Sequence, residues 1–322
     1  MIPDFSVVVP TSQKTTHLLK CLDALSRQRL PHGQFEIIVV DDANDRATAE
    51  AVRSFTQVFG IEARYLSQPR RRGIAAARNR GWQAARGRII AFTNEDCEPQ
   101  PDWLSAAWTC FRRGAQVVSG QMRTAPSARL HPYGYAPAFA ESGDFTVANC
   151  FCLRTAIHRV GGFSEEFGIT WYEDNDLQFR LIRKGIPIAK CPEAVVLHPS
   201  QPTRSILEEE RRRSYDALLY KRHPDLYRQR MPHSRMQTAH YAGVVLSVSA
   251  VLAGALSGRF DLASLALGVW VLLTADLFWK RLPAGPITWQ GVKQAATTAI
   301  ATPFLSVYWR LYGSVKYRVL YL

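Results

Sequence analysis

The sequence has 322 residues, enough for two domains or one domain with an appendage, and 47% of them are hydrophobic, which suffices for a large core. Forty Lys plus Arg against 27 Asp plus Glu give a net charge of +13, which indicates an anionic partner: nucleic acid, a lipid surface or a phosphorylated substrate. The six cysteines form no CxxC pair and have no partnering histidines, a pattern that argues against a zinc site or a disulfide framework.

The first hundred residues alternate between short apolar runs and amphipathic runs of helical period. Strands are predicted at 5–10, 35–40, 61–66 and 89–92, each followed or preceded by a helix. This alternation predicts a helix-covered parallel sheet, in which residues 1–100 form a nucleotide-binding half. No basic and apolar leader precedes the strand at Phe5, so we expect no cleavable secretion signal.

Residues 101–202 have a looser pattern that predicts a mixed sheet. Strand patterns occur at 116–120 and 145–153, after a helical run through Phe111. The intervening segment 124–142 is rich in Pro and Tyr and has no apolar periodicity. A loop of that length is typical of a functional element, and we expect it to shape an acceptor pocket.

Acidic residues follow two of the predicted strands. Asp41 and Asp42 end the second strand, and Glu95 and Asp96 follow the strand at 89–92. In an open α/β sheet, ligands bind at the carboxyl ends of the strands. Asp96 is a candidate ligand for Mg²⁺ or Mn²⁺, which take carboxylate and phosphate oxygens. The alternative for Asp41 and Asp42 is a role in turn formation and helix capping.

A third acidic group, Glu173, Asp174 and Asp176, opens a predicted helix. Carboxylates at this end of a helix favour the positive end of its dipole, so capping alone explains Asp174 or Asp176. The functional alternative is that one of them takes a proton from an acceptor hydroxyl as a general base.

The C-terminal part of the chain is predicted to associate with a membrane. Residues 203–238 form a basic juxtamembrane helical region, in which each cation adds about 1 kcal/mol of attraction to an anionic leaflet. Two apolar stretches, 241–257 and 262–279, are each long enough to cross a hydrocarbon core and predict a transmembrane hairpin within a membrane-associated region, 239–322. The alternative is a buried helical pair in a soluble domain.

Basic residues flank the hairpin, whereas its turn carries only Arg259. The positive-inside rule then places both ends of the hairpin, and the catalytic domain, in the cytoplasm at the inner membrane. A third stretch, 291–309, contains Lys293 and Pro303 and is interpreted as an interfacial helix. One cluster of arginines, at 70–72, 78, 80, 86 and 88, lies in the nucleotide-binding half, and the other basic residues flank the apolar segments near the end. This segregation favours sugar nucleotides and membrane lipid over nucleic acid.

Six short motifs occur in an order that resembles glycosyltransferase family 2, the inverting enzymes with a GT-A fold, over residues 5–200. The motifs are SVVVPT at 6–11, VVDD at 39–42, GIAAARNRG at 73–81, TNED at 93–96, VGGF at 160–163 and EDNDLQFR at 173–180. The resemblance implies an α/β fold, a Rossmann-like mixed sheet flanked by helices in a GT-A domain over 1–202, followed by the hairpin. It also implies a nucleotide-diphosphate sugar donor and a divalent metal, Mg²⁺ or Mn²⁺.

The resemblance assigns roles to individual residues. Asp42 would bind the base, Arg78 the nucleotide, and Asp96 the metal, while Asp174 would be the catalytic base and His198 a further metal or diphosphate ligand. Around the donor nucleotide it also places Pro10, Asp41 and Glu95. Around the acceptor and sugar it places Asn149, Gly161, Gly162, Glu173, Asp176 and Arg180.

The chain departs from the family pattern in three places. Asn94 puts a neutral amide at the first position of the metal motif, and the acid after Asp41-Asp42 comes one residue early, at Asp45. No QxxRW stretch of the processive synthases follows Asp174, so transfer of a single sugar is expected. The acceptor is expected to be lipid-linked or a cell-envelope glycan, with partners of a biosynthetic complex as a further possibility.

Two other classes of protein were weighed. A catalytically degenerate, membrane-tethered scaffold that binds nucleotide sugars is favoured by Asn94. A dinucleotide oxidoreductase is disfavoured, because Pro10-Thr-Ser-Gln-Lys14 follows the first strand where a GxGxxG would stand.

Overall fold

The computed structural model describes residues 2–124, 145–167, 172–199, 205–231, 235–282 and 286–321. These residues belong to two compact units, one ending at residue 199 and the other beginning at residue 205. The predicted acceptor loop lies outside the described residues from position 125 onward.

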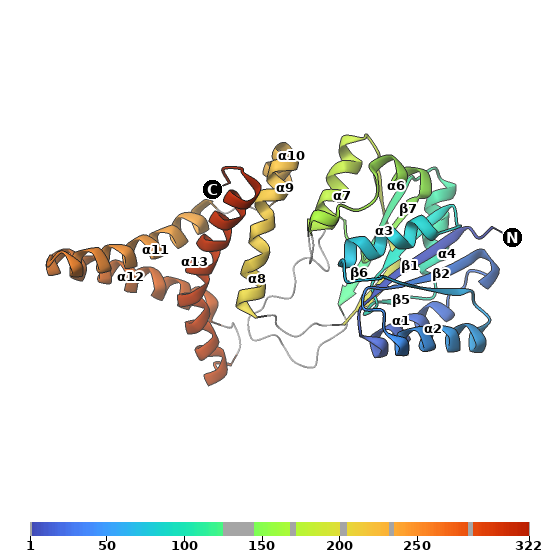
Figure 1. Ribbon diagram of the computed structural model, residues 1–322, viewed down its shortest axis with the longest axis horizontal. Helices are drawn as coiled ribbons and strands as arrows, with labels where there is room; N and C mark the ends of the chain where they lie inside the picture. The colour runs from blue at the N-terminus through green and yellow to red at the C-terminus, as the bar shows by residue number, and fades with distance from the viewer. Residues whose placement is uncertain are drawn as a thin grey trace. The chain divides into compact units, whose positions relative to one another are not determined.

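The first unit is built on an eight-stranded sheet with the order β3-β2-β1-β4-β7-β6-β8-β5 (Figure 1). The strands are β1 (Phe5–Thr11), β2 (Phe35–Asp41), β3 (Ala63–Ser67), β4 (Ile89–Thr93), β5 (Glu98–Pro99), β6 (Val117–Thr124), β7 (Asn149–Leu153) and β8 (Ile188–His198). The strands β1 to β4 are parallel, whereas β7 runs antiparallel to both β4 and β6. The predicted parallel half followed by a mixed half is therefore confirmed.

Helices cover both faces of the sheet. The helices α1 (Thr15–Ser26), α2 (Arg46–Phe59) and α4 (Trp103–Arg112) pack on one face, and α3 (Ile74–Ala84), α6 (Arg154–Val160) and α7 (Tyr172–Arg183) pack on the other. Alternate residues of β1 belong to the two hydrophobic cores. Val7 and Val9 pack on the face covered by α1, α2 and α4, and Val8 packs on the face covered by α3, α6 and α7. Burial on both faces explains why β1, β2 and β4 consist mainly of consecutive apolar residues instead of alternating apolar and polar ones.

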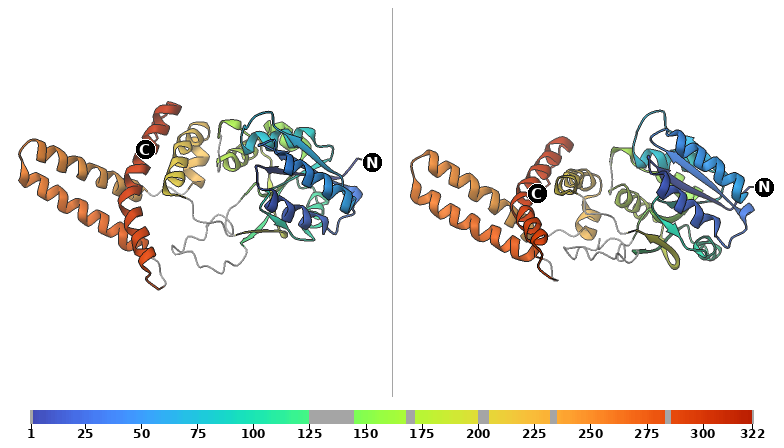
Figure 2. Two further views of the ribbon diagram at one scale, coloured as in Figure 1. Left: turned by 60° about the horizontal axis from the view of Figure 1, so that its bottom comes forward. Right: turned by 90° about the horizontal axis from the view of Figure 1, so that it is seen from below.

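The second unit is helical. Its elements are α8 (Ile206–Arg212), η3 (Arg213–Tyr215), α9 (Asp216–Arg222), α10 (Pro224–Arg230), α11 (Arg235–Leu256), α12 (Phe260–Arg281) and α13 (Trp289–Tyr317). The helices α11 and α12 form a hairpin, and α13 packs against that hairpin and against α8, η3 and α9 (Figure 2).

Two of these helices, Met236–Leu256 and Phe260–Arg281, are long and apolar enough to cross a membrane, with mean hydropathies of 1.7 and 1.8. Only 22% and 17% of their apolar windows are buried in the protein, which argues against the alternative of a buried helical pair. The third predicted stretch, 291–309, lies inside α13, a helix of 29 residues with Pro303 in its interior.

Candidate active site

The predicted acidic residues meet at one edge of the sheet because the parallel register aligns the strand ends. Thr11 pairs with Asp41 across β1 and β2, and Val8 pairs with Phe92 across β1 and β4. The antiparallel strand β7 brings its first residue, Asn149, next to Thr93 at the end of β4. The residues that follow β2 and β4 and those that precede β7 therefore share this edge, where an open α/β sheet binds its ligands.

Asp41 and Asp42 have different surroundings. The fully buried carboxylate of Asp41 accepts hydrogen bonds from the backbone N–H groups of Ala43 and Asp45 and from the Tyr65 hydroxyl. These contacts agree with the turn-forming alternative for Asp41. The carboxylate of Asp42 accepts from the N–H groups of Arg72 and Gly73, so it fixes the start of α3.

The turn after β4 brings Asp96 to His198 at the end of β8. The short strand β5 pairs with β8, with Glu98 opposite Leu197, and this pairing places Asp96 Oδ2 3.7 Å from His198 Nε2. His198 Nδ1 lies 2.8 Å from the Pro199 carbonyl, which can only accept, so Nδ1 is the donor and Nε2 is the ring nitrogen that faces Asp96. Nε2 is therefore the atom through which the ring would ligate a metal.

Asp96, His198 and the neighbouring Cys97 are close enough to hold one ion, with ligand atoms within 4.8 Å of one another. Burial raises the pKa of the Cys97 thiol, so the sulfur stays protonated and the oxygen and nitrogen donors remain. A carboxylate and an imidazole, completed by phosphate oxygens, fit Mn²⁺ or Mg²⁺ rather than a thiolate metal.

Arg78 connects the metal motif to the predicted base. Its side chain, which is 3% exposed, donates to Asn94 Oδ1 (2.9 Å) and to Glu173 Oε1 (3.1 Å), and its Nη1 lies 3.8 Å from Asp174 Oδ1. The Phe163 ring lies 5.5 Å from the guanidinium carbon. Residues as far apart in the chain as Arg78 and Glu173, which are separated by 95 positions, thus meet around one guanidinium group.

Asp174 has a partly buried environment that changes its pKa. Its Oδ2 accepts from the N–H of Val147 at 3.0 Å, and the side chain is 24% exposed. Burial, followed by the charge of Glu173, raises the pKa of Asp174 to about 7, against the opposing influence of Arg78. Three buried atoms of this cluster, Arg78 Nε, Glu173 Oε2 and Asp174 Oδ1, have no hydrogen-bond partner in the part of the chain that the structure describes. Such atoms are rare away from functional sites.

The other residues assigned to the sugar pocket make structural contacts. Arg180 pairs with Asp176 at 2.7 Å and donates to the carbonyl of Gly162. Gly161 and Gly162 have φ values of +77° and +74°, which suit glycine, and a Cβ at Gly162 would meet Asn79 Oδ1 at 2.6 Å. A role for these four residues in sugar binding stays a prediction.

Asn149 and Pro10 lie inside the sheet at the same edge. The fully buried Asn149 accepts from Trp103 Nε1 and donates to the carbonyls of Gln121 and Ala194. Pro10 is the penultimate residue of β1 and pairs with Val40 of β2. Their assignment to substrate pockets also stays a prediction.

The structure adds residues that the sequence did not single out. Lys14, which is 52% exposed, pairs with Glu95 Oε1 at 3.2 Å, and Glu95 Oε2 accepts from the N–H of Ser12. Arg72 pairs with Glu165 at 2.6 Å on the same side of the sheet. The only sequence signal for Lys14 was its place in the loop after the first strand.

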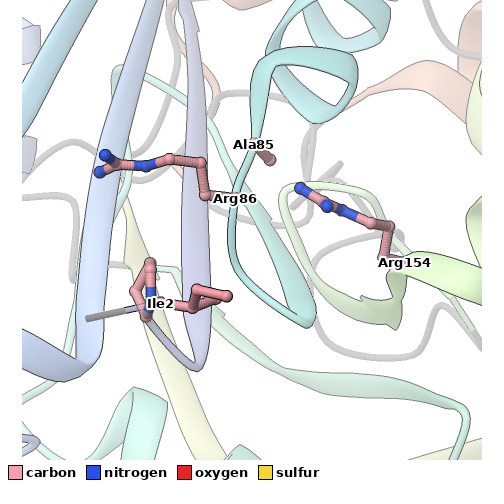
Figure 3. A pocket seen from close by; sticks show the side chains of 5 residues that line it. Ile2, Ala85, Arg86 and Arg154 are labelled. Atoms are coloured by element: carbon pink, nitrogen blue, oxygen red, sulfur yellow. The ribbon is translucent and has the colours of Figure 1, made fainter.

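A pocket lies beside the residues that precede β1 and those between α3 and β4, away from this site, and Figure 3 shows the side chains that line it. It is lined by Ile2, Pro3, Ala85, Arg86 and Arg154. The Arg86 guanidinium is already paired with Glu36 (2.9 Å) and Glu62 (2.5 Å).

Residues 6–163 match the family model described as glycosyl transferase family 2. The chain belongs to glycosyltransferase family 2. It is therefore an enzyme that transfers a sugar from a nucleotide-sugar donor, on a mixed α/β sheet of the GT-A type.

This glycosyltransferase is similar to several curated proteins. It is 24% identical over 223 residues to glycosyltransferase AglE of Haloferax volcanii, a match that covers 65% of this chain and 71% of AglE. It is 30% identical over 212 residues to the pre-mycofactocin glycosyltransferase of Mycobacterium tuberculosis, covering 61% of this chain and 42% of that protein. The chain thus spans less than half of the second relative.

Solved structures show the same fold. The mannosyltransferase PcManGT from Pyrobaculum calidifontis, in complex with GDP-Man and Mn²⁺, superposes with a TM-score of 0.57 at 19% identity, over 99% of this chain and 88% of that one. Residues 1–349 of TarS from S. aureus, in complex with UDP-GlcNAc, superpose with a TM-score of 0.52 at 14% identity, over 99% and 93%.

Proposed function

We propose that this enzyme moves a single sugar, with inversion, from a nucleotide-diphosphate sugar to a hydroxyl group of a lipid-linked or cell-envelope acceptor at a membrane. The observation that carries the proposal is the cluster in which Arg78 joins Asn94 of the metal motif to Glu173 and Asp174. Within this cluster the Asp174 carboxyl group, whose pKa is raised to about 7, lies at the edge of the sheet where the donor is expected to bind.

In the proposed reaction the acceptor oxygen attacks the anomeric carbon, the bond from that carbon to the diphosphate breaks, and the acceptor proton passes to Asp174. A single displacement inverts the anomeric centre. Arg78 orients Asp174 and keeps its carboxylate accessible to ionisation, because a neighbouring cation favours the charged form. The contacts of Arg78 favour this positioning role over the direct contact with the nucleotide that the resemblance implies.

Asp96 and His198 would hold a divalent metal together with the donor phosphates. When bound, the metal offsets the charge that grows on the leaving diphosphate. Lys14, which lies beside Glu95 at the same edge, can add positive charge near that diphosphate.

The metal site predicts a shift in metal affinity. Asp96→Asn and His198→Gln are each expected to raise the Mn²⁺ concentration needed for thermal stabilisation by GDP or UDP about tenfold or more, because each removes one ligand. Thermal shift titrations of the purified protein measure this without turnover. Asp102→Asn, which breaks a surface pair with Arg29, is the control. Unchanged Mn²⁺ titrations in both variants would remove these residues from the site.

The acceptor is placed at a membrane because the second unit contains the exposed apolar hairpin of α11 and α12. The basic residues that flank the hairpin support a cytoplasmic location of the catalytic unit at the inner membrane, by the positive-inside rule. A lipid-linked acceptor would present its hydroxyl group at that surface.

The function is tested by incubating detergent-purified protein with Mn²⁺ or Mg²⁺, a panel of nucleotide sugars and membrane extract, and measuring nucleoside diphosphate release. We expect release that depends on metal and on extract, with one sugar added per acceptor and an inverted anomer by NMR. Release absent across the panel, with nucleotide binding intact, would favour the scaffold.

The titration of Asp174 predicts the pH dependence of catalysis. A base must be deprotonated, and the pKa of Asp174 is raised to about 7, so kcat/KM should fall about tenfold per unit as the pH drops below 7 and level off above it. Rates measured over a pH series with saturating metal check this. An acid limb near pH 4 would mean that Asp174 is not the base.

The second candidate function, a scaffold that binds nucleotide sugars without turnover, is favoured by Asn94 in the metal motif. In the structure the Asn94 amide oxygen accepts from Arg78 at 2.9 Å, which gives this residue a defined place in the site. A neutral residue at this position is compatible with an active enzyme, because Asn94 still accepts a hydrogen bond from Arg78. A carboxylate in its place would add a third negative charge beside Glu173 and Asp174.

A further inference from the structure

Two arginines of the helical unit are bound by neutral hydroxyl groups instead of carboxylates. Arg281, in the last turn of α12, donates to Tyr241 of α11 (2.9 Å) and to Thr302 of α13 (3.1 Å). Arg310 of α13 donates to Thr238 of α11 at 3.1 Å and lies 5.8 Å from the Tyr321 ring centre. Among the described residues, neither arginine has a carboxylate within ion-pair distance.

The two guanidinium groups converge on the same turns of α11. The Tyr241 hydroxyl that accepts from Arg281 also accepts from Gln237 at 2.9 Å, and Gln237 is adjacent to Thr238, the partner of Arg310. The junction of α11, α12 and α13 therefore gathers two positive charges, both on half-buried side chains.

The acids around this junction have other partners. Asp276 pairs with Lys280 at 2.7 Å, Glu210 pairs with Arg213 at 2.5 Å, and the buried Asp216 accepts from the Tyr227 hydroxyl at 3.1 Å. Arg310 Nε is buried and has no partner in the described residues. A half-buried guanidinium group without a counter-ion is costly, and its planar set of five N–H donors suits phosphate oxygens.

The junction lies at the polar end of the apolar hairpin. Trp279, which is 70% exposed, comes two residues before Arg281, and exposed leucines such as Leu265 and Leu272 lie further along α12. If the hairpin spans a membrane as proposed above, this end lies at the level of the lipid headgroups, where Trp and Arg are enriched.

We propose that Arg281 and Arg310 form a binding site for the phosphate group of an anionic membrane lipid at the junction of α11, α12 and α13. This inference rests on the proposed membrane attachment. The lipid phosphate supplies the missing counter-charge, and its acyl or prenyl chains lie along the exposed faces of the hairpin.

The test uses the full chain in vesicles of pure phosphatidylcholine, of phosphatidylcholine with phosphatidylglycerol, and of phosphatidylcholine with a polyprenyl monophosphate. Lipid retention by native mass spectrometry and the rise in Tm are compared for wild type, Arg281→Gln, Arg310→Gln and the double variant. Lys293→Gln removes an exposed cation from α13, the helix that contains Arg310, and is the matched control.

We expect the double variant to bind phosphate lipids at least tenfold more weakly, while Lys293→Gln keeps wild-type affinity. Arg281→Lys keeps the charge but loses the planar arrangement of donors, so its lipid affinity should lie between those of the double variant and Lys293→Gln. This variant also provides a result if the neutral variants do not fold. Equal retention of both anionic lipids identifies a general phospholipid site, and selective retention of the polyprenyl phosphate identifies a site for a lipid-linked substrate.

Equal loss of affinity in Lys293→Gln and in the double variant would overturn the proposal in favour of diffuse charge attraction, as would full retention by the double variant. Failure of the wild-type chain to associate with any vesicle would instead contradict the membrane attachment in the proposed function. The two failures are therefore distinguishable.

Discussion

Asp174→Asn is expected to reduce sugar transfer about 10²–10⁴-fold, the range that a positioned general base contributes. The amide cannot take the acceptor proton, but it keeps the size of the carboxyl and can still accept from the N–H of Val147. Donor binding, measured by thermal shift with nucleoside diphosphate and Mn²⁺, should change little.

The same variant should not lose stability at pH 8. The folded-state pKa of about 7 lies above the value of about 3.9 for an unperturbed Asp, so the ionised carboxyl destabilises the fold increasingly from pH 4 to pH 7 and constantly above that. Asparagine removes this penalty, so the Tm of the variant should match or exceed that of wild type at pH 8, with a difference that shrinks toward pH 5. Asp23→Asn, which breaks a surface pair with Arg27, is the control for both measurements. Retained turnover, or a Tm difference that does not depend on pH, would contradict the assignment.

The arrangement of the acidic strand ends could be predicted from the sequence because apolar runs fix parallel strands. Residues 5–10, 35–40 and 89–92 are mostly apolar runs, interrupted only by Ser6 and Glu36, and each lies in an interior strand of the sheet. In the sheet β2 and β4 lie on either side of β1 and run parallel to it, so Asp42 and Asp96 follow strand ends at the same edge. The hydrophobic pattern of the strands is therefore sufficient to predict that Asp42 and Asp96 follow strand ends.

The partners of those residues could not be predicted. The spacing of Ala75, Arg78 and Trp82 places Arg78 on the buried face of α3. The sequence does not indicate that Glu173 and Asp174 are the residues that contact Arg78 on that face. The contact between Asp96 and His198 depends on β5, a strand of two residues that leaves no periodic signal. Contacts made by short strands and by residues far apart in the chain need coordinates.

Arg78→Gln is expected to lower both stability and activity by large factors. It leaves Glu173 and Asp174 buried without their cation, and removal of one partner from a buried pair costs about 3–5 kcal/mol. Because Arg78 lowers the pKa of Asp174, its loss should also move the acid limb of kcat/KM to higher pH. Chemical denaturation of the free protein measures the first effect, and rates over a pH series measure the second.

Arg78→Lys separates positioning from binding and remains informative if the glutamine variant does not fold. A lysine keeps the positive charge but cannot bridge Asn94 and Glu173 through a planar fork, so kcat should fall while KM for the donor stays near wild type, with a smaller shift of the acid limb. Arg80→Lys, on the same helix, provides the matched control. If instead KM for the donor rises and neither kcat nor the pH profile changes, Arg78 contacts the nucleotide directly. The contacts of the guanidinium group with Asn94, Glu173 and Asp174 argue for the first result, because they direct Arg78 toward the proposed base.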